Sequence, residues 1–187
     1  MTDMDTTTTT TLPLAPGVWT LDAAHSRVGF AIRHIGVSKV RGRFSEFDAE
    51  LVVGTTAEDT AVTATIATAS IDTGNPDRDA HVQTADFIDV ERRPTLAFRS
   101  TAIRGQGTDW VLEGDLTIGE VTRPVTLDVE LGGVEEFMGD GRKHAGFEAT
   151  GELRRKDFEL RFAGVGDLGL GDVVKLELDL QFVEPAH

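Results

Sequence analysis

The chain has 187 residues, of which 40% are hydrophobic, and this suits a single domain that can bury a core without a disulfide. It contains no cysteine, so disulfide bonds and thiol nucleophiles are excluded. With 32 acidic against 18 basic residues, its formal net charge is -14, which repels phosphate backbones, so we expect no nucleic-acid partner.

The first 16 residues have the composition of a disordered tail. They carry a run of threonines from Thr6 to Thr11, without the basic start and the apolar stretch of a signal peptide. Nowhere does the chain hold the roughly 18 apolar residues in a row that suggest a membrane span. We therefore expect a tail at 1–16, one domain at 17–187, a cytoplasmic location and no membrane span.

Most of the domain alternates apolar and polar residues at a period of two, which is typical of strands with one buried face. The clearest alternation runs from Val174 to Phe182. Loops are expected at Val134–Lys143 and Leu160–Gly171. In chain order, we expect strands at Val18–Asp22, Arg27–Arg33, Val40–Val53 with a bulge or bend near Ser45, Ala61–Ala69, Thr95–Ile103, Asp109–Ile118, Pro124–Gly132, His144–Arg154 and Asp172–Val183.

One helix is predicted between the fourth and fifth strands. Asn75 can cap it, Pro76 suits its first position, and the early aspartates favour the positive end of its dipole. We expect it to reach Ala85 and, because its apolar face is thin, to act as a plug or lid. A sheet with one apolar face and no long covering helix closes on itself, so the expected fold is all-β, an antiparallel β-barrel of about eight strands with one short inserted helix.

Ten short stretches carry a family resemblance. They are Leu21–Ser26, His34–Phe44, Ser70–Asn75, Arg78–His81, Ala85–Phe87, Pro94–Phe98, Gly114–Ile118, Arg123–Val125, Gly146–Ala149 and Arg155–Phe158. Together they resemble the YceI-like polyisoprenoid-binding family, over Trp19–Val183. The resemblance implies a lipocalin-like β-barrel, often a homodimer, whose elongated apolar interior holds a polyprenyl chain or a similar fatty ligand without a cofactor.

The apolar interior residues are the candidate ligand-binding set. The residues alone favour a barrel filled by its own side chains, whereas the resemblance implies a hollow one. The set consists of Phe30, Ile32, Phe44, Phe47, Phe87, Phe98, Leu116, Ile118, Leu127, Phe147 and Phe158.

Polar residues around the predicted helix form a second candidate set, which either ties the helix to the strands or reads a head group at the mouth. The set consists of Asp22, His25, Arg43, Arg78, Asp79, His81 and Asp86. Lys39 and Arg41 could help Arg43 to neutralise a phosphate or quinone head group, or could simply be solvated. The histidines show none of the paired spacings of a metal site, so no metal is expected.

These observations predict a carrier or storage protein for a long apolar lipid, without catalysis. The alternative is a lipid-directed hydrolase or isomerase with His25 or His81 as general base, although no serine lies in a nucleophile-elbow pattern. A third interpretation is a pure interaction module, which the few solvent-facing apolar residues, such as Val183, do not favour.

Overall fold

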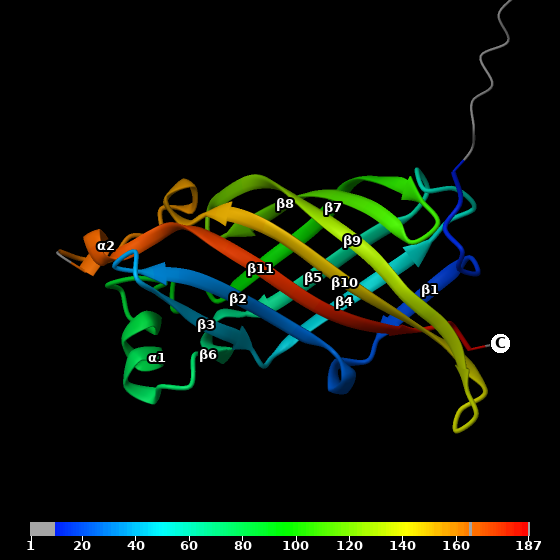
Figure 1. The fold of residues 1–187 in the computed structure, drawn as a ribbon, viewed down its shortest axis with the longest axis horizontal. Coiled ribbons are helices and arrows are strands. Elements are labelled where there is room, and N and C mark those ends of the chain that lie inside the picture. Colours follow the sequence, from blue (N-terminus) through cyan, green and yellow to red (C-terminus); the bar gives the residue numbers. More distant parts are fainter. Residues whose placement is uncertain (1–9, 165, 187) are drawn as a thin grey trace, which may run out of the picture.

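The strands form an antiparallel meander that closes on itself in the computed structural model, which describes residues 10–164 and 166–186 (Figure 1). Its eleven strand segments occupy eight positions around a barrel, because three positions are each filled by two successive segments. The segments are β1 (Gly17–Leu21), β2 (Arg27–His34), β3 (Ser38–Phe44), β4 (Phe47–Val53), β5 (Ala61–Ala67), β6 (Ile71–Asp72), β7 (Thr95–Gln106), β8 (Asp109–Ile118), β9 (Val121–Phe137), β10 (Arg142–Arg154) and β11 (Leu170–Val183). The barrel closes where β11 pairs with β1 and β2, which confirms the predicted fold class.

The three composite positions are bent strands. A 3-10 turn at Ala23–His25 separates β1 from β2, and another at Thr68–Ser70 separates β5 from β6. At the first bend the Ser26 hydroxyl accepts the Gln181 N–H at 2.9 Å and donates to the Asp22 carbonyl at 2.7 Å, which bridges the gap in the ladder. The predicted bend near Ser45 is confirmed, because β3 ends at Phe44 and β4 begins at Phe47.

The prediction of a loop at Val134–Lys143 was wrong for most of its length. β9 continues to Phe137 and β10 begins at Arg142, so the hairpin extends beyond the barrel. The pairing shifts from Phe147 opposite Leu131 to Gly146 opposite Gly133, which leaves Gly132 as the extra residue of a bulge. This bulge reverses the polarity pattern and so hid the strand. Of the loop predicted at Leu160–Gly171, residues 160–164 are irregular, as expected, whereas Gly166–Gly169 form the short helix α2 and β11 already begins at Leu170.

The predicted tail lies partly outside the described residues, which begin at Thr10. Residues 10–16 differ from the prediction because they pack on the barrel. The Thr10 carbonyl accepts the Ala57 N–H at 2.8 Å, Leu14 is buried, and the Ala15 carbonyl accepts the Trp19 indole N–H at 2.9 Å. The folded domain therefore includes these residues as well as those from position 17.

The inserted helix α1 (Pro76–Gln83) lies at one end of the barrel, in the connection from β6 to β7 (Figure 1). The Asn75 side chain accepts the Arg78 N–H at 3.0 Å, so the predicted cap is confirmed. Val82 of this helix is buried with Ile71 and Ile88, and Phe30 and Phe44 pack against that cluster. The helix thus covers the barrel end, as a lid would.

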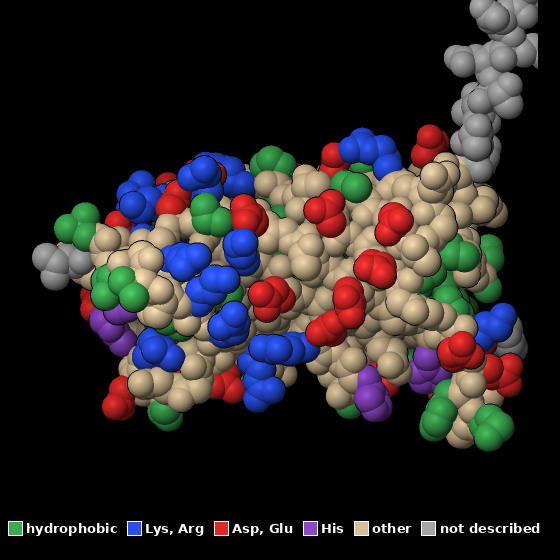
Figure 2. Space-filling view, viewed as in Figure 1, with side chains coloured by type: hydrophobic (Ala, Val, Ile, Leu, Met, Phe, Trp, Pro, Cys, Tyr) green, Lys and Arg blue, Asp and Glu red, His purple; other side chains and the backbone are tan. Residues whose placement is uncertain are grey.

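The two ends of the barrel differ in packing and in charge. At the end away from α1, Trp19, Leu51, Leu131 and Phe182 meet in a buried cluster that fills the interior. Figure 2 shows Lys and Arg side chains gathered over the half of the molecule that holds β2, β3 and α1, and acidic side chains over the other half. No helix in the described part of the chain is long and apolar enough to cross a bilayer.

Candidate ligand-binding cavity

A cavity of about 430 Å³ lies inside the barrel beneath α1. Its size falls in the range of roughly 300–1,000 Å³ that is usual for small-molecule sites. On β2 the lining extends from Phe30 to His34, and four residue steps at about 3.3 Å each give a length of about 13 Å along the strand. The apolar lining residues are Phe30, Ile32, Val40, Phe44, Ile71, Val82, Phe87, Ile88, Leu96, Ile118, Leu153, Leu160, Phe162, Leu170, Val174 and Leu176.

The predicted ligand-binding set divides between this cavity and the solid core. Phe30, Ile32, Phe44, Phe87 and Ile118 line the cavity. The other six do not line it. Four of them pack together in a neighbouring cluster: Phe98, Leu116, Leu127 and Phe158. Phe147 packs beside the Trp19 cluster, and Phe47 is half-buried on β4 opposite Ile66. The barrel is therefore hollow at one end and filled at the other.

The floor of the cavity is set by the pairing of β7 with β8. Leu96 lies opposite Ile118, and both line the cavity. One step further along each strand at the same face, Phe98 lies opposite Leu116, and neither lines it. The Phe98 ring lies over Gly114, where a side chain would collide with it. The Phe98 level is thus where side chains close the interior.

Two segments contact each other across the mouth of the cavity. The Phe87 ring, from the turns after α1, stacks on the Phe162 ring with centroids 4.1 Å apart and planes 13° apart. The His81 ring lies 5.7 Å from the same Phe162 ring, and the Asp86 carbonyl accepts the Ala163 N–H at 3.0 Å. This contact between residues 86–87 and 162–163, which we call the seam, joins the helical lid to the loop before α2.

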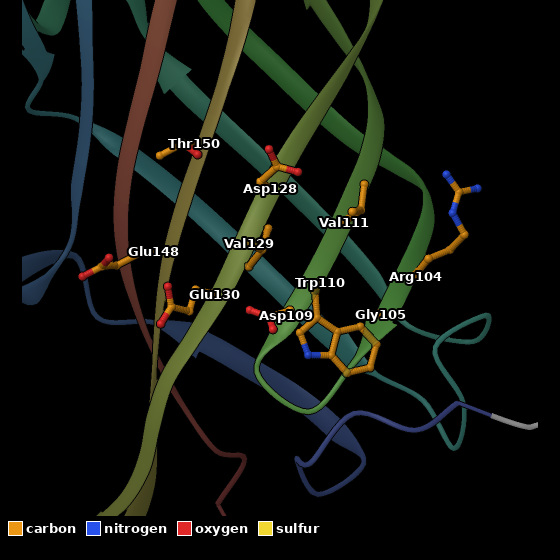
Figure 3. A pocket seen from close by; sticks show the side chains of 10 residues that line it. All are labelled: Arg104, Gly105, Asp109, Trp110, Val111, Asp128, Val129, Glu130, Glu148 and Thr150. Atoms are coloured by element: carbon orange, nitrogen blue, oxygen red, sulfur yellow. The ribbon is translucent and has the colours of Figure 1, made fainter.

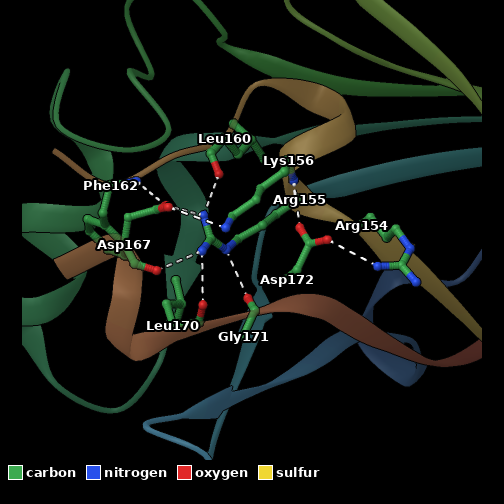
Figure 4. Close-up of polar contacts among 9 residues, drawn as sticks. All are labelled: Arg154, Arg155, Lys156, Leu160, Phe162, Asp167, Leu170, Gly171 and Asp172. Atoms are coloured by element: carbon green, nitrogen blue, oxygen red, sulfur yellow. Dashed lines mark hydrogen bonds and ion pairs between the residues drawn. The ribbon is translucent and has the colours of Figure 1, made fainter. Parts of the chain in front are cut away.

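Arg155 anchors that loop and also lines the cavity (Figure 4). Its side chain is 1% exposed, and its guanidinium donates to the carbonyls of Leu160, Asp167, Leu170 and Gly171 at 2.8–3.2 Å and to the Asp167 carboxylate at 2.5 Å. The hydrogen bond from Arg155 lowers the pKa of Asp167 below its usual value. All five N–H groups have partners, so the buried charge is satisfied.

Sequence reasoning missed Arg155 as a cavity residue, although a signal was present. Arg155 comes directly after β10, as the first residue of a 3-10 turn (Arg155–Phe158), and it follows the inward-facing Ala149, Gly151 and Leu153 at a period of two. A charge at an inward position needs several acceptors, and the following glycine-rich loop supplies them as backbone carbonyls. The sequence marked the arginine by its position but gave no sign of which carbonyls it would reach.

The polar residues of α1 hold the lid to the end of β6. Arg78 donates from Nε to the Thr73 hydroxyl at 2.8 Å and from Nη2 to the Thr73 carbonyl at 2.9 Å. Asp79 accepts the Thr73 N–H at 3.0 Å and its hydroxyl at 2.5 Å. His81 pairs with Asp86 at 3.2 Å, with both side chains exposed. Arg78 and His81 also line the mouth, so these two can meet a ligand head group.

The remaining predicted polar residues lie away from the mouth. Arg43 pairs with Asp72 at 3.2 Å on the outer surface. The His25 Nδ1 lies 2.8 Å from the Asp22 carboxylate, and this hydrogen bond lowers the pKa of Asp22. Because His25 is 69% exposed and lines neither hollow described here, it has no enclosed site in which to act as a general base. Asp22 instead belongs to the bend between β1 and β2.

A second hollow of about 410 Å³ lies on the outer face of β8, β9 and β10 (Figure 3). The carboxylates of Asp109, Asp128, Glu130 and Glu148 surround it, from positions that the strand register places side by side. Clustered negative charge makes this hollow unsuited to an apolar ligand. Within residues 10–164 and 166–186, no group of three or more His, Asp or Glu side chains is arranged so that it could hold a metal ion.

Comparisons with known proteins agree with this geometry. A family model described as the YceI-like domain matches residues 19–182. Protein YceI of Escherichia coli O17:K52:H18 (strain UMN026 / ExPEC) is 39% identical over 145 residues, which are 75% of this chain and 73% of that protein. The crystal structure of the Campylobacter jejuni YCEI protein is 31% identical with a TM-score of 0.71, over 89% of this chain and 98% of that one. A polyisoprenoid binding domain from Saccharophagus degradans is 16% identical with a TM-score of 0.65 over the same shares, a likeness that shows the fold alone.

Proposed function

We propose that this chain, which belongs to the YceI-like domain family, holds the tail of a polyisoprenoid or a similar long apolar lipid beneath α1, without catalysing a reaction. The single observation that carries the proposal is the apolar cavity, which is lined from seven strands (β2, β3, β6, β7, β8, β10 and β11) and from the lid. The description of the Saccharophagus degradans domain as polyisoprenoid-binding supports the ligand class.

The energetics of the proposal depend on how much of the tail is buried. At about 0.3 kcal/mol per heavy atom, roughly 20 buried carbons contribute about 6 kcal/mol, and roughly 40 contribute about 12 kcal/mol. These energies correspond to affinities of tens of micromolar and about nanomolar. Because hydrocarbon makes no hydrogen bonds, the length of the hollow must set the preference among tails. Affinity should rise with tail length and stop rising once the tail reaches the Phe98 level.

The mouth is suited to a polar or anionic head group. Arg78 and His81 line it, and each already has a partner, Thr73 or Asp86, that fixes its position. A head group placed between them would stay in contact with water while the tail enters the barrel. Lys39, Arg41 and Arg43 do not line the cavity and instead lie on the outer surface of β3.

Organic extraction of the freshly purified chain, followed by mass spectrometry, tests the proposal directly. We expect a near-stoichiometric lipid, or uptake of added polyprenyl compounds by the empty protein. Leu176→Trp, which fills the cavity from β11, should abolish both. Glu177→Trp is the matched control, because the neighbouring side chain is exposed. A folded wild-type protein that neither retains nor takes up lipid would overturn the proposal.

Three finer parts of the proposal come from the sequence. The first is the absence of catalysis. The alternative of a hydrolase or isomerase is not favoured, since His25 lies outside the cavity and His81 is exposed at its mouth. A His25→Ala, His81→Ala double variant that loses turnover of a lipid ester would revive it. A homodimer and a cytoplasmic location stay predictions, which light scattering and cell fractionation would check.

A further inference from the structure

Three exposed apolar side chains gather at the rim of the hollow end. Ile35 and Val37, in the turn between β2 and β3, are 63% and 77% exposed, and Leu168 in α2 is 87% exposed. The two segments touch, since the Gly169 carbonyl accepts the Ile35 N–H at 2.6 Å. None of the three lines the cavity. We call Ile35, Val37 and Leu168 the apolar tip.

The conformation of the turn makes this exposure unusual. The loop of this hairpin holds residues 35–37, because His34 lies opposite Ser38. Ile35 and Gly36 have φ of 46° and 71°, and the His34 carbonyl accepts the Val37 N–H at 3.1 Å, so they are the central residues of a β-turn with two positive φ angles. Such turns favour Asn-Gly, and a β-branched residue at positive φ is strained. Ile35 is therefore unfavourable in two ways: its backbone conformation is strained, and its apolar side chain is exposed to water. Within the described residues, little packing compensates for these costs.

A basic surface surrounds the tip on the β2–β3 side. Exposed Arg33 and Lys39 lie directly opposite each other, and exposed Arg41 lies opposite Ala31 on the same outer face. Like charges in facing positions repel. Among the ion pairs of the described part of the chain, these three side chains have none. We call Arg33, Lys39 and Arg41 the basic collar of a chain whose net charge is -14. The strands that carry them, β2 and β3, lie in the half of the molecule where Figure 2 shows Lys and Arg side chains gathered.

The other end of the molecule offers a different combination. The tip of the β9–β10 hairpin also exposes apolar residues, Phe137 at 59% and Met138 at 96%. The charges around this tip are mixed: Glu135, Glu136 and Asp140 are acidic, whereas Arg142 lies opposite Phe137 and Lys143 opposite Glu136. Apolar side chains at a tip are thus present at both ends, but at this end acidic residues outnumber the basic ones.

We propose that the hollow end docks on the surface of an anionic lipid bilayer, with the apolar tip entering the head-group region and the basic collar facing the lipid phosphates. An apolar tip within a basic surface matches the chemistry of such a membrane, where each Lys or Arg contributes about fivefold to binding. Docking turns the cavity mouth toward the lipids. The inference goes beyond the proposed function, because its residues are separate from the cavity lining.

Vesicle flotation with the full chain tests the docking. We expect binding to vesicles of phosphatidylcholine with about 30% phosphatidylglycerol, weakening with salt, and little binding to phosphatidylcholine alone. Replacing Lys39 and Arg41 by Gln should weaken it by about 25-fold, from two factors of about five. Ile35→Asn should also weaken it, although Asn suits the turn and should leave the melting temperature equal or higher. Met138→Asn, at the acidic end, should change nothing.

The same samples separate this inference from the proposed function when their extracted lipid is measured. Protein that carries lipid but floats with neither kind of vesicle overturns the docking alone. Vesicle binding without any lipid in the cavity supports the docking and counts against the proposed function. Two other outcomes would give this surface a different role and overturn the docking. One is a dimer, seen by light scattering, that Ile35→Asn dissociates. The other is binding of free glycerol phosphate by a protein that has no affinity for vesicles.

Discussion

Replacing Arg155 by Met is the most informative perturbation of the mouth. The substitution keeps an unbranched side chain of similar length but removes the guanidinium that joins β10 to the loop of residues 160–171. Four backbone carbonyls lose a donor, and Asp167 keeps only Lys156 at 3.5 Å as an ion-pair partner. The loop should therefore lose its attachment to the barrel.

The expected size of the effect follows from burial. Removing one member of a buried ion pair costs about 3–5 kcal/mol. Asp167 is 17% exposed, so it can turn toward water, which places the loss of unfolding free energy near the lower value, at about 3 kcal/mol. For a domain of this size that corresponds to a fall in melting temperature of about 6–12 °C.

Urea unfolding, with hydrogen exchange of residues 160–171, measures both the global and the local effect. Arg154→Met is a stringent control, because the neighbouring arginine is 63% exposed and pairs with Asp172 at 3.3 Å on the surface (Figure 4). Such a surface pair contributes about 0–1 kcal/mol. If Arg155→Met unfolds like Arg154→Met and leaves the exchange of the loop unchanged, the anchoring role of Arg155 is refuted.

Three further predictions concern acid, the seam and the floor. Hydrogen bonds lower the pKa of four aspartates, Asp22, Asp72, Asp140 and Asp167. Each ionised carboxylate therefore stabilises the folded state at pH values above its pKa in the unfolded chain, and this stabilisation is lost as the pH falls through its lower pKa in the folded state. The unfolding free energy that they contribute should be constant from about pH 8 to 5 and decline below about pH 4, and a decline already near pH 6 in urea titrations would implicate other groups. Phe162→Ala removes a stack worth about 0.5–1.5 kcal/mol and should speed the release of a fluorescent lipid in stopped flow, whereas Phe137→Ala should not. Phe98→Ala should cost about 3–5 kcal/mol and extend the preference to longer tails, whereas Phe147→Ala, in the filled half, should only destabilise.

Alternation predicted the strands because the barrel buries one face of each of them. The Asn75 cap and the bend between Phe44 and Phe47 could be predicted for a related reason: each is encoded by neighbouring residues. The extension of β9 could not, because the bulge at Gly132 exchanges the two faces halfway along the strand. Alternation with a period of two does not reveal where one extra residue is inserted in a strand.

Whether the interior is hollow depends on side chains that meet from strands far apart in the sequence. Phe30 and Phe98 look alike in the chain, and each lies over a glycine of the next strand, Gly42 or Gly114. Yet Phe30 borders the cavity, whereas Phe98 closes it. The difference comes from what lies across the barrel at each level, which only the closed structure brings together. For the same reason the sequence could name the ligand-binding set but could not predict which of its members line the cavity and which fill the core.

The contacts around the mouth differ in strength, and the weakest of them indicates where a ligand enters. The lid is held by buried Val82 and Ile88 and by the bonds to Thr73, and the facing loop is held by Arg155 at about 3 kcal/mol. The seam between them consists of one aromatic stack and one backbone hydrogen bond, which together contribute about 2 kcal/mol. The weakest contact lies between two anchored segments, so opening the seam requires neither segment to unfold. A tail should therefore pass between Phe87 and Phe162, on the side of the barrel where the apolar tip lies.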